Sequence, residues 1–367
     1  MNAKLMVVGP FPPPTHGFAE ITRQLADRAQ DFGDVERLNV ASNAANPISR
    51  HLSQLGKNTR AAWKIATAPL QGCRTAAIGV NGGLGLIYTV FFTIAARLSG
   101  VSASLHHHSY GYIDNPNALM RAICAIAGQN IRHVFLSDAM RCTFEDVYGT
   151  RDGSLVLPNA IFVPAVPQTQ AINRAPSVRL RIGLLSNLSA EKGLHDFILT
   201  ARALRNEGLD VTMVLAGPIA LASDRDLTEE AQKEGIIEWV GPKHGEEKAQ
   251  FFSQLDLFLF PTRYKYEAQP TVIYEAFSHG VPVIAFARGS VADQVGDCVS
   301  AIARHESFVS QAVAFIRSMM EMNERERLNL RVQAHGRHAA HAAQGYESLE
   351  ELFRDDKVNS PNAKVAT

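Results

Sequence analysis

Apolar residues along the chain form short continuous runs that alternate with longer stretches of helical periodicity. Residues 5–9 form the first run, and apolar positions recur at helical spacing over 19–29 directly after it. Strands that alternate with helices in this way predict a parallel sheet covered by helices on both faces. The further apolar runs of this first series lie at 37–40, 76–80, 102–106, 133–136 and 155–157.

A stretch with four prolines at 158–178 interrupts the alternation and predicts a linker. A second series follows, so the sequence predicts an α/β protein of two doubly wound, Rossmann-like domains that face each other across a cleft. Ligands of such sheets bind beyond the carboxyl ends of the strands, and we expect the chemistry there. The second series has expected strands at 181–185, 211–216, 236–240, 255–260 and 281–285, and expected helices at 191–206, 271–278 and throughout 305–355.

The composition suits a large folded protein. With 367 residues, 46% of them hydrophobic, the chain can bury a sizeable core, which excludes a disordered tail or a small stapled scaffold. Its 36 basic and 36 acidic residues cancel, which argues against a dedicated nucleic-acid binder. Four scattered cysteines without a paired motif predict reduced thiols and a cytoplasmic location.

The zero net charge hides a difference between the two halves. Residues 1–160 carry 14 basic and 10 acidic side chains, whereas residues 161–367 carry 22 and 26. Between Glu36 and Asp114 there are seven basic residues and no acidic one. This distribution predicts a basic surface on the N-terminal half only.

One uncharged segment, 75–96, is long enough to span a bilayer. Asn81 and the glycines at 82, 83 and 85 interrupt it, so we predict a strand, a glycine-rich loop and a buried helix instead. The apolar run near the N-terminus is too short for a signal peptide.

Two loops that follow predicted strands could bind an anion. The proline-rich loop 9–17 ends at Gly17, where the missing Cβ lets the backbone approach a ligand. It matches neither the GxGxxG fingerprint nor the Walker pattern, and a rigid turn is its alternative interpretation. In loop 186–193, Lys192 stands at a predicted helix start, where its charge opposes the helix dipole and suggests a bound diphosphate. A solvated lysine is the alternative there.

The most informative segment runs from Phe260 to Ala276, after a strongly apolar strand. Glu267 lies in its loop, and Glu275 lies eight residues later inside a predicted helix. One carboxylate can accept hydrogen bonds from sugar hydroxyls and the other from a ribose. The backbone amides between them, at Ala268, Gln269, Pro270 and Thr271, surround a helix start that can hold phosphate oxygens.

Three adjacent histidines, His106, His107 and His108, end a predicted strand of the first half. Strand side chains alternate, so His106 and His108 can share a face. No nearby acidic or cysteine ligand supports a metal site, and a hydrogen-bonding role at the strand end fits better.

With these motifs the chain resembles the retaining GT-B glycosyltransferases of glycosyltransferase family 4 (group 1 type). The resemblance covers nearly the whole chain and is strongest over 181–290. It implies an acceptor-binding domain at 1–160, a linker at 161–178 and a donor-binding domain at 179–340. It further implies that a helix at 341–356 crosses back to the first domain, before a polar tail at 357–367 that we expect to be disordered.

The resemblance also assigns roles to the candidate residues. Glu275 should bind the donor ribose, Glu267 should lie near the transferred sugar, and Lys192 and Gly17 should contact the diphosphate. The family histidine near the reacting sugar maps to His108, with His107 as the alternative. The family often has an arginine where this chain has Asn187, an amide that can bond a phosphate but not neutralise it. Arg263 or Lys243 could compensate.

The implied reaction is transfer of a sugar from a nucleotide diphosphate, UDP- or GDP-linked, to an acceptor hydroxyl with retained anomeric configuration, in cell-surface polysaccharide or glycolipid synthesis. No metal is required if Lys192 and backbone amides stabilise the departing diphosphate. Two other classes stay open: a nucleotide-sugar-binding protein without transferase activity, and a GT-B-shaped nucleotide-sugar epimerase.

The acid-free segment adds a candidate partner. Within residues 50–74, basic side chains such as Arg60 and Lys64 alternate with apolar ones such as Leu52 and Trp63. This spacing suits a helix at the surface of an anionic membrane, and we expect peripheral contact with the inner face of the membrane there. A solvated helix and a pocket for an anionic acceptor are the alternatives.

Overall fold

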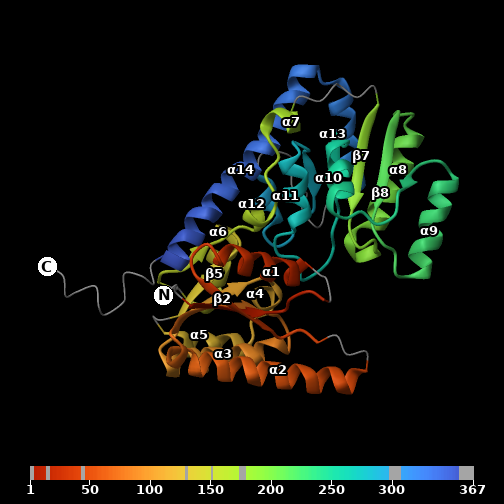
Figure 1. Ribbon diagram of the computed structural model, residues 1–367. Coiled ribbons are helices and arrows are strands. Elements are labelled where there is room, and N and C mark those ends of the chain that lie inside the picture. The colour runs from red at the N-terminus through yellow and green to blue at the C-terminus, as the bar shows by residue number, and fades with distance from the viewer. Residues whose placement is uncertain are drawn as a thin grey trace. The chain divides into compact units, whose positions relative to one another are not determined.

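A computed structural model of the chain divides into two compact units. Unit 1 comprises the described residues up to Phe162 together with those from Ala343 onward, and unit 2 comprises Val163–Ala342 (Figure 1). Part of the expected linker, residues 173–178, and the expected tail, residues 357–367, lie outside the described residues. The structure describes residues 4–13, 17–42, 46–128, 131–149, 152–172, 179–296 and 307–354.

Unit 1 is built on a six-stranded parallel sheet, and all of its strands overlap the apolar runs of the sequence. The order of the strands in the sheet is β2-β1-β3-β4-β5-β6. The strands are β1 (Lys4–Gly9), β2 (Asp34–Asn39), β3 (Cys73–Val80), β4 (Ser102–His107), β5 (Ile131–Phe135) and β6 (Leu155–Val156). The connecting helices are α1 (Gly17–Ala29), α2 (Pro47–Thr67), η1 (Ala68–Gln71), α3 (Gly85–Ser99), α4 (Gly111–Asp114), α5 (Ala118–Ala127), α6 (Asp138–Tyr148) and η2 (Asn159–Phe162).

The uncharged segment 75–96 folds as predicted, into most of β3, a glycine-containing loop and most of α3. Thr89 and Thr93 of α3 are buried, and each bonds a carbonyl one turn earlier. None of the helices in the described part of the chain has the length and apolarity needed to cross a bilayer.

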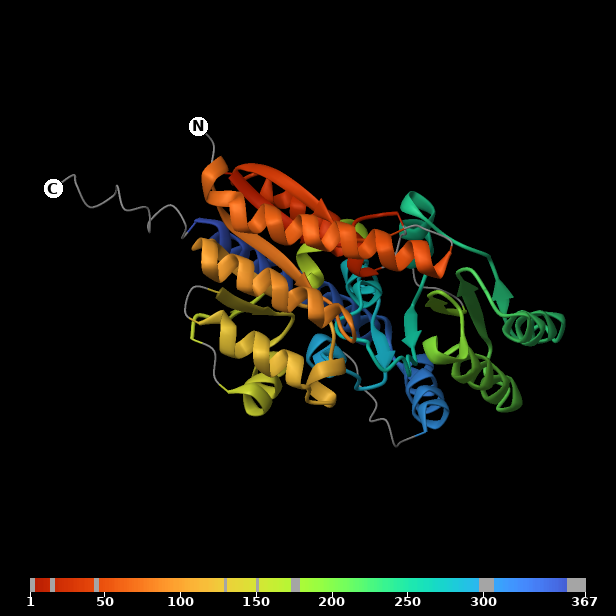
Figure 2. The ribbon, with the colours of Figure 1, turned by 90° about the horizontal axis from the view of Figure 1, so that it is seen from below.

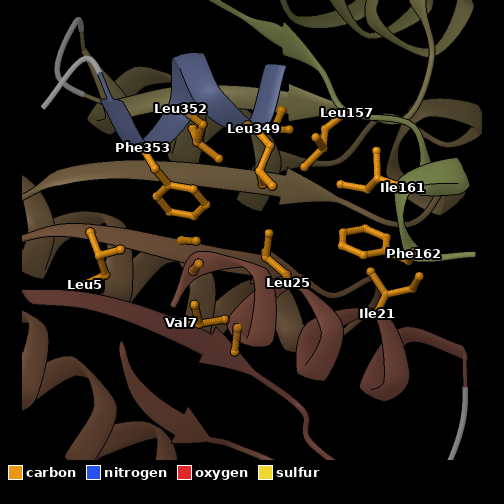
Figure 3. Close-up of a cluster of buried hydrophobic side chains, with 14 of the residues drawn as sticks. Leu5, Val7, Ile21, Leu25, Leu157, Ile161, Phe162, Leu349, Leu352 and Phe353 are labelled. Atoms are coloured by element: carbon orange, nitrogen blue, oxygen red, sulfur yellow. The ribbon is translucent and has the colours of Figure 1, made fainter. Parts of the chain in front are cut away.

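Unit 1 has a core in which the two ends of the chain meet (Figure 3). Leu5 and Val7 of β1 and Leu25 of α1 pack with Leu349 and Phe353. The last two residues belong to α14 (Glu324–Arg354), a helix whose first part is counted with unit 2 and whose last part, from Ala343, is counted with unit 1. A glycine on that last part, Gly345, allows the close approach, because a Cβ there would lie 2.2 Å from Ile161 Cγ2.

Unit 2 has a five-stranded parallel sheet of order β11-β10-β7-β8-β9. Numbered within the unit this is the Rossmann order 3-2-1-4-5 read from the other edge, so the strand order reverses between β7 and β10. The strands are β7 (Leu180–Leu185), β8 (Val211–Ala216), β9 (Glu238–Trp239), β10 (Leu257–Phe260) and β11 (Val283–Ala285). The helices are α7 (Gln168–Ile172), η3 (Ala190–Lys192), α8 (Leu194–Asn206), α9 (Ala222–Lys233), α10 (Gly245–Ser253), α11 (Thr271–Ser278), α12 (Val291–Val295) and α13 (Phe308–Glu321).

Two predicted helices of the second half differ from the observed ones. The helix predicted from residue 191 begins only at Leu194, because Ser189 caps the separate turn η3 and Gly193 leaves it with a φ of 87°. The described part of the stretch 305–355, residues 307–354, contains two helices, α13 and α14, rather than one. Asn323 and Glu326 bond each other's backbone N–H at 3.0 and 2.8 Å, a capping box that starts α14 afresh.

Candidate functional site

The loops after β7 and β10 meet at the point where the strand order of unit 2 reverses. Lys192, from the first loop, places Nζ 2.6 Å from Oε2 of Glu267, from the second. Thr262 Oγ1 donates to the same oxygen at 3.1 Å, and the ring of Tyr264 lies under the ammonium, 4.3 Å from Nζ. Two sequence-predicted residues 75 positions apart are therefore adjacent at the edge of the sheet where ligands of Rossmann folds bind.

Both paired groups keep hydrogen-bonding capacity for a ligand. An ammonium has three N–H donors, so Lys192 can keep its bond to Glu267 and still donate to a phosphate oxygen. Within the described residues both hydrogen bonds to Glu267 end on Oε2, so Oε1 can accept from a sugar hydroxyl. The side chains of Lys192 and Glu267 are 24% and 12% exposed, so their attraction is only partly screened by water.

Two glycines hold these loops in close contact. At Gly193, φ is 87° and an added Cβ would lie 2.4 Å from the carbonyl oxygen of Pro261. At Gly289, in the loop after β11, φ is 55° and an added Cβ would lie 2.3 Å from the carbonyl oxygen of Glu267. Both positions thus need glycine for conformation and for space. Gly193 holds the backbone next to Lys192 against Pro261, and Gly289 holds the backbone of Glu267 against the loop after β11.

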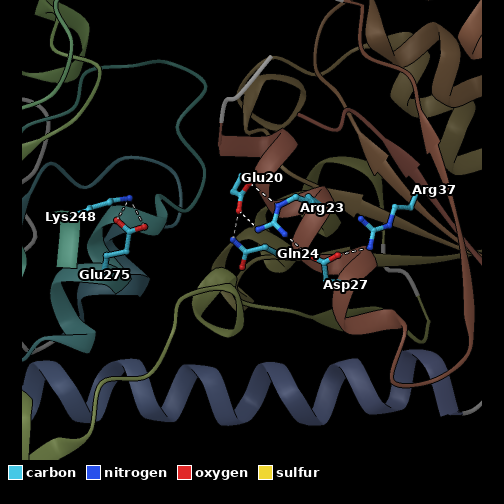
Figure 4. Close-up of polar contacts among 7 residues, drawn as sticks. All are labelled: Glu20, Arg23, Gln24, Asp27, Arg37, Lys248 and Glu275. Carbon is cyan, nitrogen blue, oxygen red and sulfur yellow. Dashed lines mark hydrogen bonds and ion pairs between the residues drawn. The ribbon is translucent and has the colours of Figure 1, made fainter. Parts of the chain in front are cut away.

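The second glutamate of the motif, Glu275, lies inside α11 and is held by a lysine that sequence reasoning missed. Lys248, on α10, places Nζ 2.6 and 2.7 Å from the two carboxylate oxygens of Glu275 (Figure 4). Lys248 lies within a helix and does not follow a strand, so its position in the sequence does not indicate a role at the site. The carboxylate, 21% exposed, keeps lone pairs for further donors.

The segment between the two glutamates is firmly anchored. Ala268 and Gln269 are buried, and Ser290 N donates to Ala268 O at 2.8 Å. Gln294 Nε2 donates to Pro270 O at 2.9 Å. Thr271 is the first residue of α11 and no side chain caps this start. An uncapped helix start is the kind of site that binds anions through its first backbone N–H groups.

The residues proposed to replace the family's arginine have partners of their own. Arg263 forms a two-pronged bond to Asp196, at 2.8 and 2.9 Å, and this hydrogen-bonded carboxylate raises its pKa. Lys243 lies 3.9 Å from Glu247. Asn187 is exposed in the loop after β7. Lys192 is therefore the cation that the structure brings to Glu267, whereas Arg263 pairs with Asp196 of α8.

The three histidines at the end of β4 have different surroundings. His106 is buried and its Nε2 lies 2.9 Å from Ser104 Oγ, and burial lowers its pKa to about 3. His107 is fully buried; Nδ1 lies 2.8 Å from Tyr112 Oη and Nε2 lies 2.9 Å from His133 Nδ1. Burial lowers the pKa of His107 as well. These two rings are structural parts of unit 1.

His108, just after β4, is the one ring of the triplet that is partly exposed. The surrounding protein still removes enough water to lower its pKa to about 4, so the ring is neutral at neutral pH. It packs against Phe18, with ring centroids 4.6 Å apart. Phe18 follows Gly17, where an added Cβ would meet no described heavy atom within 4 Å. Residues 14–16 of the proline-rich loop lie outside the described residues.

The acidic and histidine side chains do not converge into a metal centre. Across the described ranges, no group of three or more His, Cys, Asp or Glu residues is placed to hold a metal ion.

Comparisons with known proteins relate this chain to glycosyltransferases. Residues 167–336 match the family described as Glycosyl transferases group 1. A segment of 127 residues is 28% identical to the putative colanic acid biosynthesis glycosyltransferase WcaL of Salmonella typhimurium, and it covers 33% of this chain and 31% of that protein. The chain thus spans about a third of the length of the curated relative it matches.

Solved structures resemble the chain over almost its whole length. Sucrose-phosphate synthase from Thermosynechococcus elongatus aligns with a TM-score of 0.70 at 16% identity, over 98% of this chain and 100% of that one. Anabaena Alr3699/HepE in complex with UDP aligns with a TM-score of 0.67 at 16% identity, over 97% and 98%. The likeness confirms the predicted GT-B fold of two Rossmann-like domains.

Proposed function

We propose that this chain is a glycosyltransferase that takes its sugar from a nucleotide-diphosphate donor bound by unit 2. The observation that carries the proposal is the contact between Lys192 and Glu267 at the strand-order reversal of a Rossmann sheet. A cation for a diphosphate and a carboxylate for sugar hydroxyls occur there together, inside the segment that matches Glycosyl transferases group 1.

We assign UDP as the nucleotide, because the similar Anabaena protein is described in complex with UDP and with UDP-glucose. Glu275 accepts hydrogen bonds from the ribose hydroxyls, and Lys248 holds its carboxylate in place. Asn187 and the backbone N–H groups of Ala268, Gln269 and Thr271 bond the phosphate oxygens, while Pro270, which has no N–H, shapes the loop. Because Asn187 brings no charge, Lys192 carries the stabilisation of the leaving diphosphate.

The proposed reaction retains the anomeric configuration and needs no metal. As the glycosidic bond to the diphosphate breaks, negative charge grows on the leaving phosphate oxygen. In this proposal Lys192 and the N–H groups at the start of α11 stabilise that charge. The acceptor oxygen attacks from the same side, and its proton passes to that phosphate oxygen. Glu267 positions the sugar hydroxyls and is neither nucleophile nor base.

His108 and Gly17, in unit 1, complete the proposed set. His108 is neutral, because its pKa is lowered to about 4, so it can donate a hydrogen bond from one ring nitrogen to the reacting sugar while adding no charge. Gly17 offers the backbone of α1's first turn to the diphosphate.

We assign the acceptor to an anionic or lipid-linked saccharide of surface polysaccharide synthesis. The name of the relative in Salmonella typhimurium refers to colanic acid biosynthesis, and the first 160 residues of this chain carry an excess of four basic side chains.

Donor binding gives the sharpest test. Calorimetric titration with UDP, GDP and ADP should show binding of UDP alone, and Lys192→Met should weaken it by about tenfold to a hundredfold, the effect of losing one charged hydrogen bond. Lys233→Met, at the exposed end of α9, is the matched control. Binding of none of the three nucleotides, or equal binding by Lys192→Met, would refute the assignment of the donor site.

Product analysis then separates the reaction classes. UDP-glucose incubated with lipid-linked saccharides should yield UDP and a product whose new linkage keeps the anomeric configuration by NMR, in the presence of EDTA. Binding of UDP-glucose without any transferred sugar would identify a binding protein, and a change of the donor sugar's stereochemistry would identify an epimerase.

A further inference from the structure

The exposed large hydrophobic side chains of this protein are concentrated on one pair of helices. Of fifteen such side chains among the described residues, nine lie between Ile48 and Leu98. They are 39–87% exposed, so they are not part of the core. We call them the α2–α3 face; its members are Ile48, Leu52, Leu55, Trp63, Leu70, Leu84, Ile87, Phe91 and Leu98.

Most of these side chains form two stripes rather than a scatter. Ile48, Leu52, Leu55 and Trp63 recur at helical spacing on α2, opposite the buried Ala61 and Ile65. Ile87, Phe91 and Leu98 do the same on α3, opposite the buried Phe92 and Ala96, while Leu84 caps the start of α3 and Leu70 lies on η1. Both helices lie side by side on one face of the unit 1 sheet (Figure 2), so both stripes point away from it.

The chain segment that carries this face has charges of a single sign. From residue 37 to residue 113 the chain has seven basic residues and no acidic one. Arg37 is neutralised by Asp27 of α1 (Figure 4), and Lys64 lies 2.9 Å from Glu36. Arg60 and Arg74 are exposed and make no ion pair within the described residues. An apolar surface with an unneutralised guanidinium group on its own helix, that of Arg60 on α2, is complementary to an apolar phase with an anionic boundary.

We propose that the α2–α3 face docks this protein on an anionic phospholipid bilayer, with Trp63, Phe91 and the leucines in the interfacial region and the arginines at the phosphate groups. A second copy of the chain would bring together two surfaces that each carry unneutralised arginine such as Arg60, and this repulsion disfavours a dimer through the same face. A helix with Trp and Leu on one side and Lys and Arg on its flank is the known form of an interfacial helix.

The proposal goes beyond the segment 50–74 that the sequence singled out. Figure 2 and the exposed residues of α3 extend the surface to a second helix. It does not depend on the proposed transferase activity, because docking can be measured without substrate or turnover.

Sedimentation with large unilamellar vesicles tests the proposal on the full chain. The protein should bind vesicles of phosphatidylcholine with phosphatidylglycerol and should not bind pure phosphatidylcholine. The triple variant Leu52→Ser, Trp63→Ser, Phe91→Ser should bind at least about tenfold more weakly, because burial of one large apolar side chain alone contributes about that factor. Arg60→Gln and Arg74→Gln should each cost about fivefold, and more salt should weaken binding of the wild type.

A matched pair of exposed leucines in unit 2 serves as the control. Leu199→Ser with Leu221→Ser removes side chains that are 50% and 61% exposed and should leave vesicle binding unchanged. All these sites are exposed, so the urea midpoint of each variant should equal that of the wild type and confirm its folding.

Three results would overturn the proposal. The first is no binding of the wild type to anionic vesicles. The second is equal binding by the triple variant. The third is a dimer in light scattering that the triple variant abolishes, since a second copy would then cover the face. In contrast, vesicle binding by a chain that binds no nucleotide would refute the proposed function and leave this proposal standing.

Discussion

Gly193→Ala should separate Lys192 from Glu267 without touching either side chain. The methyl group would lie 2.4 Å from the carbonyl oxygen and 2.7 Å from the carbonyl carbon of Pro261, closer than real contacts allow. Either the turn η3 or the loop after β10 must therefore move. These are the two loops that hold Lys192 and Glu267 2.6 Å apart.

The expected loss of stability has two parts. A φ of 87° costs an L-residue roughly 1–2 kcal/mol, and the overlap with Pro261 adds about 1–3 kcal/mol as an overpacked contact does. Gly208→Ala is the matched control at the other end of α8, where φ is 70° and a Cβ would meet no described atom within 4 Å. Gly208→Ala should lose only the stability that the positive φ costs, without the part caused by overlap.

Fluorescence during urea unfolding can measure both variants in unit 2. The chain has two tryptophans, and Trp239 reports on unit 2, where its Nε1 donates to Gly217 O at 3.1 Å. A Trp63→Phe background leaves it as the single reporter. Titration of the same proteins with UDP should show weaker binding for Gly193→Ala alone. If Gly193→Ala matched Gly208→Ala in both stability and UDP affinity, the contact with Pro261 would not be what fixes the loops.

Three further perturbations follow from the same geometry. Lys248→Met leaves Glu275 without its ion pair and should weaken UDP binding by about tenfold, whereas Lys243→Met should not; equal affinities for UDP would contradict the positioning role of Lys248. Glu267→Gln keeps the size of the side chain but removes its charge, and should lower kcat far more than it raises KM for the donor sugar; a change confined to KM would contradict a role in the transition state. The pKa of His106 is lowered to about 3 in the folded chain, so the unfolded chain takes up the proton first as the pH falls below about 6.5. Between that pH and the folded pKa, the free energy of unfolding should fall by about 1.4 kcal/mol per pH unit. A His106→Asn variant with the same pH slope, measured by urea unfolding, would contradict this.

The sequence alone determined the fold class. Central parallel strands are buried on both faces and are therefore apolar along their length. Each such run can be recognised from its own residues, without knowledge of the residues that it will contact. Position after a strand also identified Lys192 and Glu267 as candidates, because the carboxyl ends of parallel strands lie on one edge of the sheet.

Local pattern failed where capping competes with helical periodicity. Residues 191–192 and 321–322 are acceptable helix formers. Gly193 with its positive φ and the capping box of Asn323 and Glu326 nevertheless end one element and begin the next. Capping of this kind depends on where a side chain finds its bond, which apolar periodicity does not report.

Only the tertiary structure decided which partner each charge has. Strand order brings Lys192 to Glu267 across 75 residues, and the contact of α10 with α11 brings Lys248 to Glu275 across 27 residues. It also assigns Arg263 to Asp196 and separates the three histidines, of which His108 alone keeps an exposed ring. Sequence fixes side-chain chemistry and local periodicity, whereas long-range pairing is set by which strand ends become neighbours, and that is a property of the folded sheet.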